Sequence, residues 1–184
     1  MKETVDLVPY RDVWPVRFRE LGKALRRELD GLALRIDHIG STSVPGLSAK
    51  DIIDVQISVA SFVPLDAYRC PLSKLGYAYR KGHGKEGPDL SKRYFRERKG
   101  PETHIHVVRD GSWAQVVQLL LRDYLRESDN DRRLYETSKW KLARKCGNDR
   151  DRYNTAKRRV IWDILERAHW WSQKTGWFPG PSDA

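Results

Sequence analysis

Hydrophobic positions in the first third of the chain change from helical to strand-like spacing. Apolar residues recur every three or four positions from Trp14-Pro15 to Asp30-Gly31, which predicts an amphipathic helix. Its apolar stripe consists of Phe18, Leu21, Leu25 and Leu29. Residues 34–38 alternate between apolar and polar, and residues 52–59 form a short β-branched run. These segments predict a half-buried and a buried strand. A short first strand is expected at residues 4–8.

The middle of the chain predicts one helix and three further strands. The helix covers residues 66–75 and ends at Gly76, and Pro71 should lie in its first turn or break it. The strands are expected at residues 77–80, 93–98 and 104–109. Residues 81–91 contain three glycines and a proline among charged residues, which predicts a mobile loop.

From Ser112 onward the spacing is helical. Helices are expected from residue 113, over about residues 131–145, and over about residues 149–174, and the last ten residues are predicted to be a frayed tail. The pattern therefore predicts an α+β fold, with a mixed sheet, flanking helices and a C-terminal helical bundle. We expect one domain over residues 1–178 and a flexible tail at residues 179–184.

Composition narrows the choice of partners. The 184 residues carry a formal net charge of +10, which favours nucleotides, nucleic acid, phosphorylated metabolites or anionic membranes. An arginine-rich coding background explains the same surplus equally well. The two cysteines, Cys70 and Cys146, show no metal-ligand spacing and indicate a reducing compartment. No apolar leader or long apolar run is present, so we expect a cytoplasmic protein without a membrane partner.

The most distinctive stretch is the loop between the first two long strands. It begins at Gly40-Ser41, and it is rich in glycine and hydroxyl side chains, whose backbone N–H groups can bind anions. The strand that follows contains Asp54 in an otherwise apolar run. A carboxylate in such a strand is costly unless it is paired or bound to metal.

These residues carry a resemblance to known proteins. The spacing in this chain, with Gly40-Ser41 followed after twelve residues by Asp54 on a strand, resembles the signature of the nucleotidyltransferase superfamily. More closely, residues 39–47 (Ile-Gly-Ser-Thr-Ser-Val-Pro-Gly-Leu), residues 49–54 and residues 104–107 (His-Ile-His-Val) resemble the GrpB family, also called UPF0157. The resemblance runs through most of the chain and implies a nucleotidyltransferase-like mixed sheet.

The resemblance also implies roles for the loop and the strand. Gly40 and Ser41, with Thr42 and Ser43 beside them, would approach the phosphates of ATP or another nucleoside triphosphate. Asp54 would be the first carboxylate that binds a divalent metal, Mg²⁺ or Mn²⁺. The matching pattern has a second acid two positions later, where this chain has Gln56. A neutral amide there puts the usual two-metal mechanism in doubt. Alternatively, Asp54 forms an ion pair with a buried Arg or with Lys50.

His104 and His106 alternate on one strand, so their side chains share a face. By resemblance they fall where the superfamily places its third acid. With Asp54 they would form a catalytic and metal-binding set that suits Mn²⁺, Fe²⁺ or Zn²⁺ better than Mg²⁺. They could instead contact phosphate, act as a general base, or simply bond to neighbours in the sheet. The same question applies to His38.

Several cations are candidate phosphate contacts: Lys50, Arg93, Arg96, Lys139 and Lys157. The last two each follow a tyrosine by four residues, which places each pair on one helix face. Solvated helix charges are the alternative explanation. Arg122-Asp123 is expected to form a structural ion pair between helix and sheet, and Trp170-Trp171 is a candidate for self-association into a homodimer.

Two functions follow. The first is a nucleotidyltransferase-like enzyme that binds a nucleoside triphosphate and a divalent metal, and transfers a nucleotidyl or phosphoryl group to an unknown small-molecule acceptor. The second is a non-catalytic module for a nucleotide or phosphorylated small molecule. GrpB-type domains are fused to dephospho-CoA kinase in some bacteria, which implies a CoA-related ligand for the module. Nucleic-acid binding rests on charge alone and is disfavoured.

Overall fold

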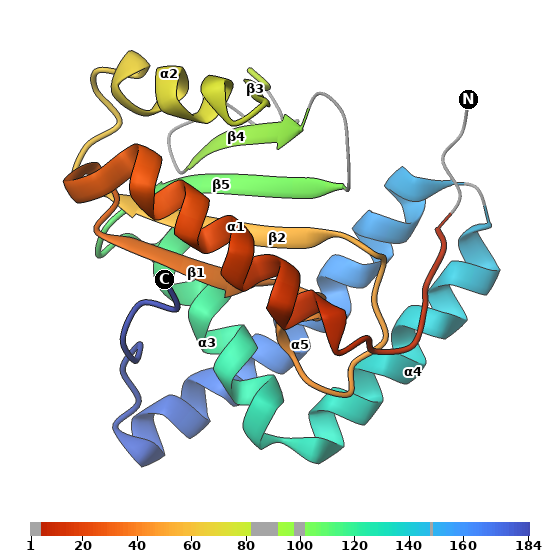
Figure 1. Ribbon diagram of the computed structural model, residues 1–184. Coiled ribbons are helices and arrows are strands. Elements are labelled where there is room, and N and C mark those ends of the chain that lie inside the picture. The colour runs from red at the N-terminus through yellow and green to blue at the C-terminus, as the bar shows by residue number, and fades with distance from the viewer. Residues whose placement is uncertain (1–4, 82–91, 98–101, 148) are drawn as a thin grey trace.

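The computed structural model describes residues 5–81, 92–97, 102–147 and 149–184, and builds them around a five-stranded sheet (Figure 1). The strands are β1 (Arg35–Ile39), β2 (Ile53–Val59), β3 (Tyr77–Tyr79), β4 (Lys92–Glu97) and β5 (Thr103–Arg109). The helices are α1 (Val13–Leu29), α2 (Asp66–Lys74), α3 (Trp113–Glu127), α4 (Asp129–Cys146) and α5 (Arg150–Thr175), with short 3-10 turns η1 (Asp30–Leu32) and η2 (Ser41–Ser43). The α+β class with a mixed sheet is confirmed.

The sheet has the strand order β1-β2-β5-β4-β3. β2 and β5 pair in parallel, whereas every other neighbouring pair is antiparallel. The parallel register sets Asp54 beside His104 and Gln56 beside His106. Because side chains alternate along a strand, these four residues share one face of the sheet.

The opposite face packs against α1 and α2. α1 crosses the sheet in front in Figure 1 and contacts β1 and β2. Its residues Trp14, Phe18 and Leu25 are buried against sheet residues such as Val55 and Ile57. This apolar layer holds α1 in the position that its sequence spacing predicts.

The C-terminal helices pack on the face that carries the polar residues. Each begins at a capping side chain, since Ser112, Ser128 and Asp149 accept hydrogen bonds from the first turns of α3, α4 and α5. A second apolar cluster joins these helices to the loop that follows β1, to which the loop contributes Val44 and Leu47. None of the described helices combines the length and apolarity that a bilayer span requires.

Three expectations about local structure are wrong. Within residues 5–8, only an isolated bridge from Val8 to Ala49 forms instead of a strand. Pro71 lies in the interior of α2, which is one short helix of nine residues. The predicted mobile loop at residues 81–91 is not among these errors and stays a prediction, because all of it except Lys81 lies outside the described residues.

The predicted frayed tail is the third error, because residues 182–184 lie along the outer edge of β1 (Figure 1). Ser182 Oγ accepts a hydrogen bond from the Ile36 N–H at 2.8 Å, and Asp183 Oδ2 accepts one from the His38 N–H at 2.9 Å. Unpaired backbone groups at a sheet edge need partners, and the tail supplies them. The sequence did not predict this contact, because a tail rich in glycine and proline is typical of a flexible end.

Arg122 ties this tail to the sheet. Its guanidinium, which is 3% exposed, lies 2.7 Å from carboxylate oxygens of both Asp123 and Asp183 and donates to the carbonyl of His38. The expected Arg122-Asp123 ion pair therefore forms and extends to β1.

We predict that Asp183→Ala lowers the free energy of unfolding by about 1–3 kcal/mol. The buried Arg122 guanidinium would lose one of its two carboxylate partners but keep Asp123, and the His38 N–H would lose its acceptor. Urea unfolding followed by circular dichroism measures the loss. The matched control is Asp163→Ala on an exposed position of α5, which should change stability little. Equal stability of the two variants would show that the tail contributes nothing to the fold.

Candidate functional site

A cavity of about 840 Å³ lies between the polar face of the sheet and the C-terminal helices. Its walls come from the loop after β1, from β2, β4 and β5, and from α3, α4 and α5. Ten of the predicted site residues line it: Gly40, Ser41, Thr42, Lys50, Asp54, Arg96, His104, His106, Lys139 and Lys157. Residues from distant parts of the sequence thus meet in one place.

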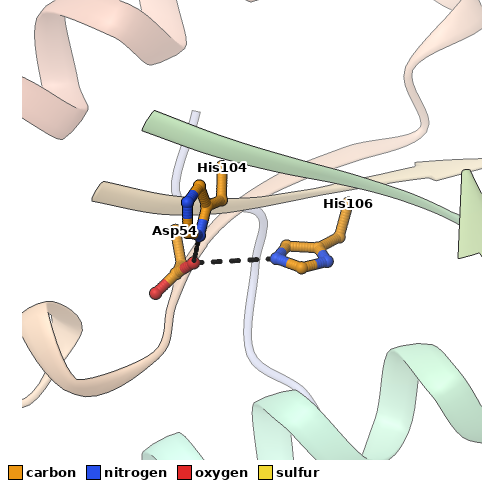
Figure 2. A group of neighbouring side chains, drawn as sticks. All are labelled: Asp54, His104 and His106. Carbon is orange, nitrogen blue, oxygen red and sulfur yellow. Dashed lines mark hydrogen bonds and ion pairs between the residues drawn. The ribbon is translucent and has the colours of Figure 1, made fainter. Parts of the chain in front are cut away.

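Asp54, His104 and His106 line the cavity on the side of the sheet, which we call its floor. Figure 2 shows the two histidine side chains reaching toward the Asp54 carboxylate. Asp54 Oδ1 lies 3.1 Å from His104 Nδ1 and 3.6 Å from His106 Nε2. Burial alone would raise the pKa of Asp54, but hydrogen bonds from His104 and His106 outweigh it and hold the pKa well below its usual range. Burial lowers the pKa of His106 despite its contact with Asp54. Asp54 is therefore a carboxylate and His106 a neutral imidazole at physiological pH.

Glu102 extends the group on the other side of His104. Its Oε1 lies 3.3 Å from His104 Nε2, 2.5 Å from an Arg96 nitrogen and 3.7 Å from an Arg150 nitrogen. His104 thus lies between two carboxylates, one at each ring nitrogen. A carboxylate at each ring nitrogen fixes the orientation of the ring.

Gly40 holds the loop directly against Asp54. Its φ of +73° favours glycine, and a Cβ at this position would lie 2.5 Å from Asp54 Oδ2. No larger residue fits without moving the carboxylate. Gly40 therefore brings the start of η2 into contact with the head of β2.

The three hydroxyl residues of η2 have different surroundings. Ser43 Oγ donates to the carbonyl of Gly40 and Thr42 Oγ1 donates to that of Ile52, so both hydroxyls bond within the loop. Ser43 is also absent from the cavity lining. Ser41 lines the cavity and makes a hydrogen bond with the Tyr135 side chain. Among these residues, Ser41 and the backbone of Gly40 are best placed to meet a ligand.

Two lysines project into the cavity from the C-terminal helices. Lys139 on α4 is 1% exposed, donates to the carbonyl of Ser48, and lies with its Nζ 4.8 Å from the centre of the Tyr135 ring. Lys157 on α5 lies with its Nζ 5.7 Å from the centre of the Tyr153 ring. Each tyrosine covers one side of its lysine, as the spacing of four residues suggests.

Positive charge is crowded in this part of the cavity. Burial lowers the pKa of Lys139 to about 7, with further repulsion from Lys157. Burial also lowers the pKa of Lys50, again with repulsion from Lys157, and that of Lys157, although Asp54 attracts its charge. The cations destabilise one another, which is the arrangement expected of a site built to receive an anion.

Gln56 occupies the position two residues beyond Asp54 and is fully buried. Its Nε2 donates to the carbonyl of Gln115 at 3.2 Å. Its Oε1 is the one buried side-chain polar atom, among the described residues, that has no hydrogen-bond partner.

Two predicted candidates lie away from this site. His38 is buried on the opposite face of the sheet, where its ring stacks on Phe18 at 4.7 Å and burial lowers its pKa to about 3. Arg93 lies over the Phe62 ring at 4.5 Å, because its neighbour Tyr94 takes the polar face of β4. Both are packing residues.

Glu102 and Arg150 were missed by the sequence analysis. Glu102 precedes His104 by two residues, so strand alternation places it on the same face and could have identified it. Arg150 precedes Lys157 by seven residues, which is two helical turns.

The residues at the floor of the cavity fit a metal ion. Asp54, His104 and His106 each offer one donor atom, and these three atoms lie within 4.8 Å of one another. Two imidazoles and one carboxylate suit Mn²⁺, Fe²⁺ or Zn²⁺. With His104 Nδ1 toward a metal, its Nε2–H would donate to Glu102, an arrangement common behind metal-bound histidines.

Comparison with known proteins identifies relatives over most of the chain. A family model described as GrpB protein matches residues 4–167. The UPF0157 protein BH1888 of Halalkalibacterium halodurans is 36% identical over 168 residues, which cover 90% of this chain and 83% of the relative. A dephospho-CoA kinase of Mycolicibacterium paratuberculosis is 30% identical over 197 residues, covering 95% of this chain but 48% of that protein.

Solved structures agree with this relationship. The conserved protein GrpB from Enterococcus faecalis has a TM-score of 0.76 and 29% identity, covering 90% of this chain and 99% of that one. Two further structures share the fold. The GLD-2/RNP-8 complex has a TM-score of 0.57 and 15% identity, covering 86% of this chain and 60% of that one. A cytoplasmic RNA terminal U-transferase has a TM-score of 0.51 and 14% identity, covering 72% of this chain and 41% of that one. The sheet and its helices are therefore of the nucleotidyltransferase type, and the resemblance stated from the sequence is confirmed.

We predict that Gly40→Ala disrupts the site as well as the loop. The new methyl group would displace the Asp54 carboxylate, which adds to a backbone cost of about 1–2 kcal/mol at positive φ. Gly46→Ala is the matched control, because Gly46 has a φ of +75° in the same loop but no atom closer than 4.0 Å to a new Cβ. Thermal unfolding and Mn²⁺ titration should show a larger loss for Gly40→Ala in both measurements. Equal losses would exclude a role for the Gly40–Asp54 contact.

We predict that Lys139 makes the stability of the protein depend on pH. Its pKa of about 7 lies below the ordinary value of 10.5, so the unfolded chain binds more protons between these values and stability rises with pH there. Lys139→Met should flatten the rise by up to about 1.4 kcal/mol per pH unit and raise stability at pH 7. Urea unfolding at pH 7.5, 8.5 and 9.5 measures the slope. Lys141→Met, at an exposed position of α4, should keep the wild-type slope, and an unchanged slope in Lys139→Met would contradict the prediction.

Proposed function

The chain belongs to the GrpB family, and from that premise we propose that it binds a nucleoside triphosphate and a divalent metal ion, and transfers a nucleotidyl or phosphoryl group to a small-molecule acceptor. The observation that carries this proposal is the crowding of Lys50, Lys139 and Lys157 in a cavity whose floor is a carboxylate and two imidazoles. A polyphosphate would relieve the repulsion among the lysines, and the floor residues would hold its metal partner.

The phosphates would lie between the loop and the C-terminal helices. Gly40 and Ser41 lie at the start of the short turn η2 and line the same cavity as Lys139 and Lys157. Backbone N–H groups of such a small-residue loop and the Ser41 hydroxyl are suited to phosphate oxygens. Hydrogen bonds from one wall and positive charge from the other would fix the chain of phosphates in extended form.

The floor of the cavity would position the reacting phosphate. A divalent ion held by Asp54 with His104 and His106 would neutralise the charge that develops during transfer. In the transfer, an acceptor hydroxyl oxygen bonds to phosphorus, the bond to the leaving phosphate oxygen breaks, and the hydroxyl proton passes to a base. His106, neutral and in contact with Asp54, is suited to accept that proton where it does not ligate the ion.

The second candidate function is a binding module without turnover. Gln56 favours it, because a neutral amide cannot bridge two cations as a carboxylate does. The similarity to a protein named dephospho-CoA kinase favours a CoA-related ligand for such a module. Either function fits a cytoplasmic protein whose partner is a phosphorylated small molecule rather than nucleic acid.

We predict that the wild-type protein binds at most one Mn²⁺ tightly per chain, and that Asp54→Asn loses metal-dependent nucleotide binding while keeping its fold. Isothermal titration with a non-hydrolysable ATP analogue, with and without Mn²⁺, measures affinity, and circular dichroism reports folding. Asp163→Asn is the control with the same substitution on the surface. If Asp54→Asn unfolds and the metal response of residual folded protein persists, Asp54 is a structural partner of His104.

Turnover separates the two functions. Labelled nucleoside triphosphates incubated with Mn²⁺ and pools of small metabolites should yield slow, acceptor-dependent release of pyrophosphate or phosphate from the enzyme. Binding without release in every pool would favour the module. Rapid Mg²⁺-dependent release with two bound ions would contradict the importance given to Gln56.

A further inference from the structure

Among the described residues, the side-chain oxygen of Gln56 has no hydrogen-bond donor. Its amide orientation is fixed, because Nε2 donates to the Gln115 carbonyl, which can only accept. Oε1 is left without a partner. A buried acceptor without a donor destabilises the fold until a donor reaches it. The surrounding amide cannot supply the missing donor, since Gln115 Nε2 already donates to Ser58 Oγ and Asp110 Oδ1.

The part of the cavity around Gln56 differs from the part around the lysines. Gln56 is hydrogen-bonded to α3 through the Gln115 carbonyl, and the cavity wall that α3 forms includes Ala114, Val117 and Leu121. Lys92 lines the cavity beside Val108 on the neighbouring strand. An apolar helix wall of this kind suits a flat uncharged ring.

The two parts are joined along the strands and along α5. Gln56 follows Asp54 by two residues on β2, a step of about 6.6 Å. On α5, Lys157 and Ile161 are one turn apart and both line the cavity. A sugar ring separates a phosphate from a nucleobase over a span of this size.

We infer that the Gln56 part of the cavity binds the base of the nucleotide, and that Gln56 Oε1 accepts a hydrogen bond from an amino group on that base. This inference rests on the proposed function for the phosphate end. Gln56 stands where the two-metal pattern has its second acid. Under this inference it selects the ligand instead of binding a second metal ion. Adenine and cytosine carry the required amino group at the corresponding edge, whereas hypoxanthine and uracil present an oxygen there.

The first test uses the wild-type protein alone. Isothermal titration in Mn²⁺ with tripolyphosphate, ATP, ITP, CTP and UTP should give tighter binding of ATP than ITP and of CTP than UTP, by about tenfold for a difference of one hydrogen bond. ATP should also bind more tightly than tripolyphosphate. Equal affinities for amino and oxo bases overturn the inference.

The second test uses variants. Gln56→Met keeps the length of the side chain and removes the acceptor, so it should abolish the preference for ATP over ITP while tripolyphosphate binding stays within about twofold of wild type. Gln118→Leu is the matched control, since Gln118 lines the same cavity with an exposed side chain, and it should keep the preference. Loss of the preference in both variants would show that general polarity of the wall, and not Gln56, selects the base.

The two proposals fail in different ways. If tripolyphosphate does not bind the wild-type protein and Lys157→Met changes nothing, the proposed function itself is wrong. If tripolyphosphate binds and Lys157→Met weakens it, but the base has no effect on affinity, only the inference about Gln56 is wrong. Thermal unfolding of each variant confirms that the comparison is made between folded proteins.

Discussion

The parallel pairing of β2 with β5 is the constraint on which the site depends. The two strands are far apart in the sequence, and their register sets Asp54 against His104 and Gln56 against His106. A slip of one residue would turn both histidines to the α1 side and bring Ile105 and Val107 into the cavity. The apolar residues that pack against α1 oppose such a slip, so the core on one face maintains the chemistry on the other.

The second organising feature is an imbalance of charge that the protein alone does not resolve. Among the described residues, Glu102 partly neutralises Arg96 and Arg150. Lys50 and Lys157 share Asp54 as a counter-charge, and Glu136 attracts the charge of Lys139. Burial depresses the pKa of all three lysines. A structure organised only for stability would not gather these groups, because buried like charges oppose folding. Their presence is therefore the strongest sign of a ligand.

The sequence predicted the helices and the long strands well because their apolar spacing matches the faces they bury. It also singled out the loop at Gly40 and the strand at Asp54, since small residues and a lone carboxylate are unusual in such a context. It could not assign Arg93 and His38 to a face, because alternation alone does not say which face carries the site. It also missed the tail: Asp183 and Ser182 look like ordinary loop residues, and only the free edge of β1 explains their position.

The contact between Gly40 and Asp54 has a consequence for the energetics of binding. Because nothing larger than hydrogen fits between them, the spacing between the Gly40 loop and the Asp54 carboxylate is fixed when the chain folds. Under the proposed function, a ligand that bridges the two would meet a preorganised pair, and little of its affinity would be lost to further ordering of the protein. Selectivity would then come from the rigid spacing, because a ligand whose phosphate and metal are separated by a different distance could not reach both.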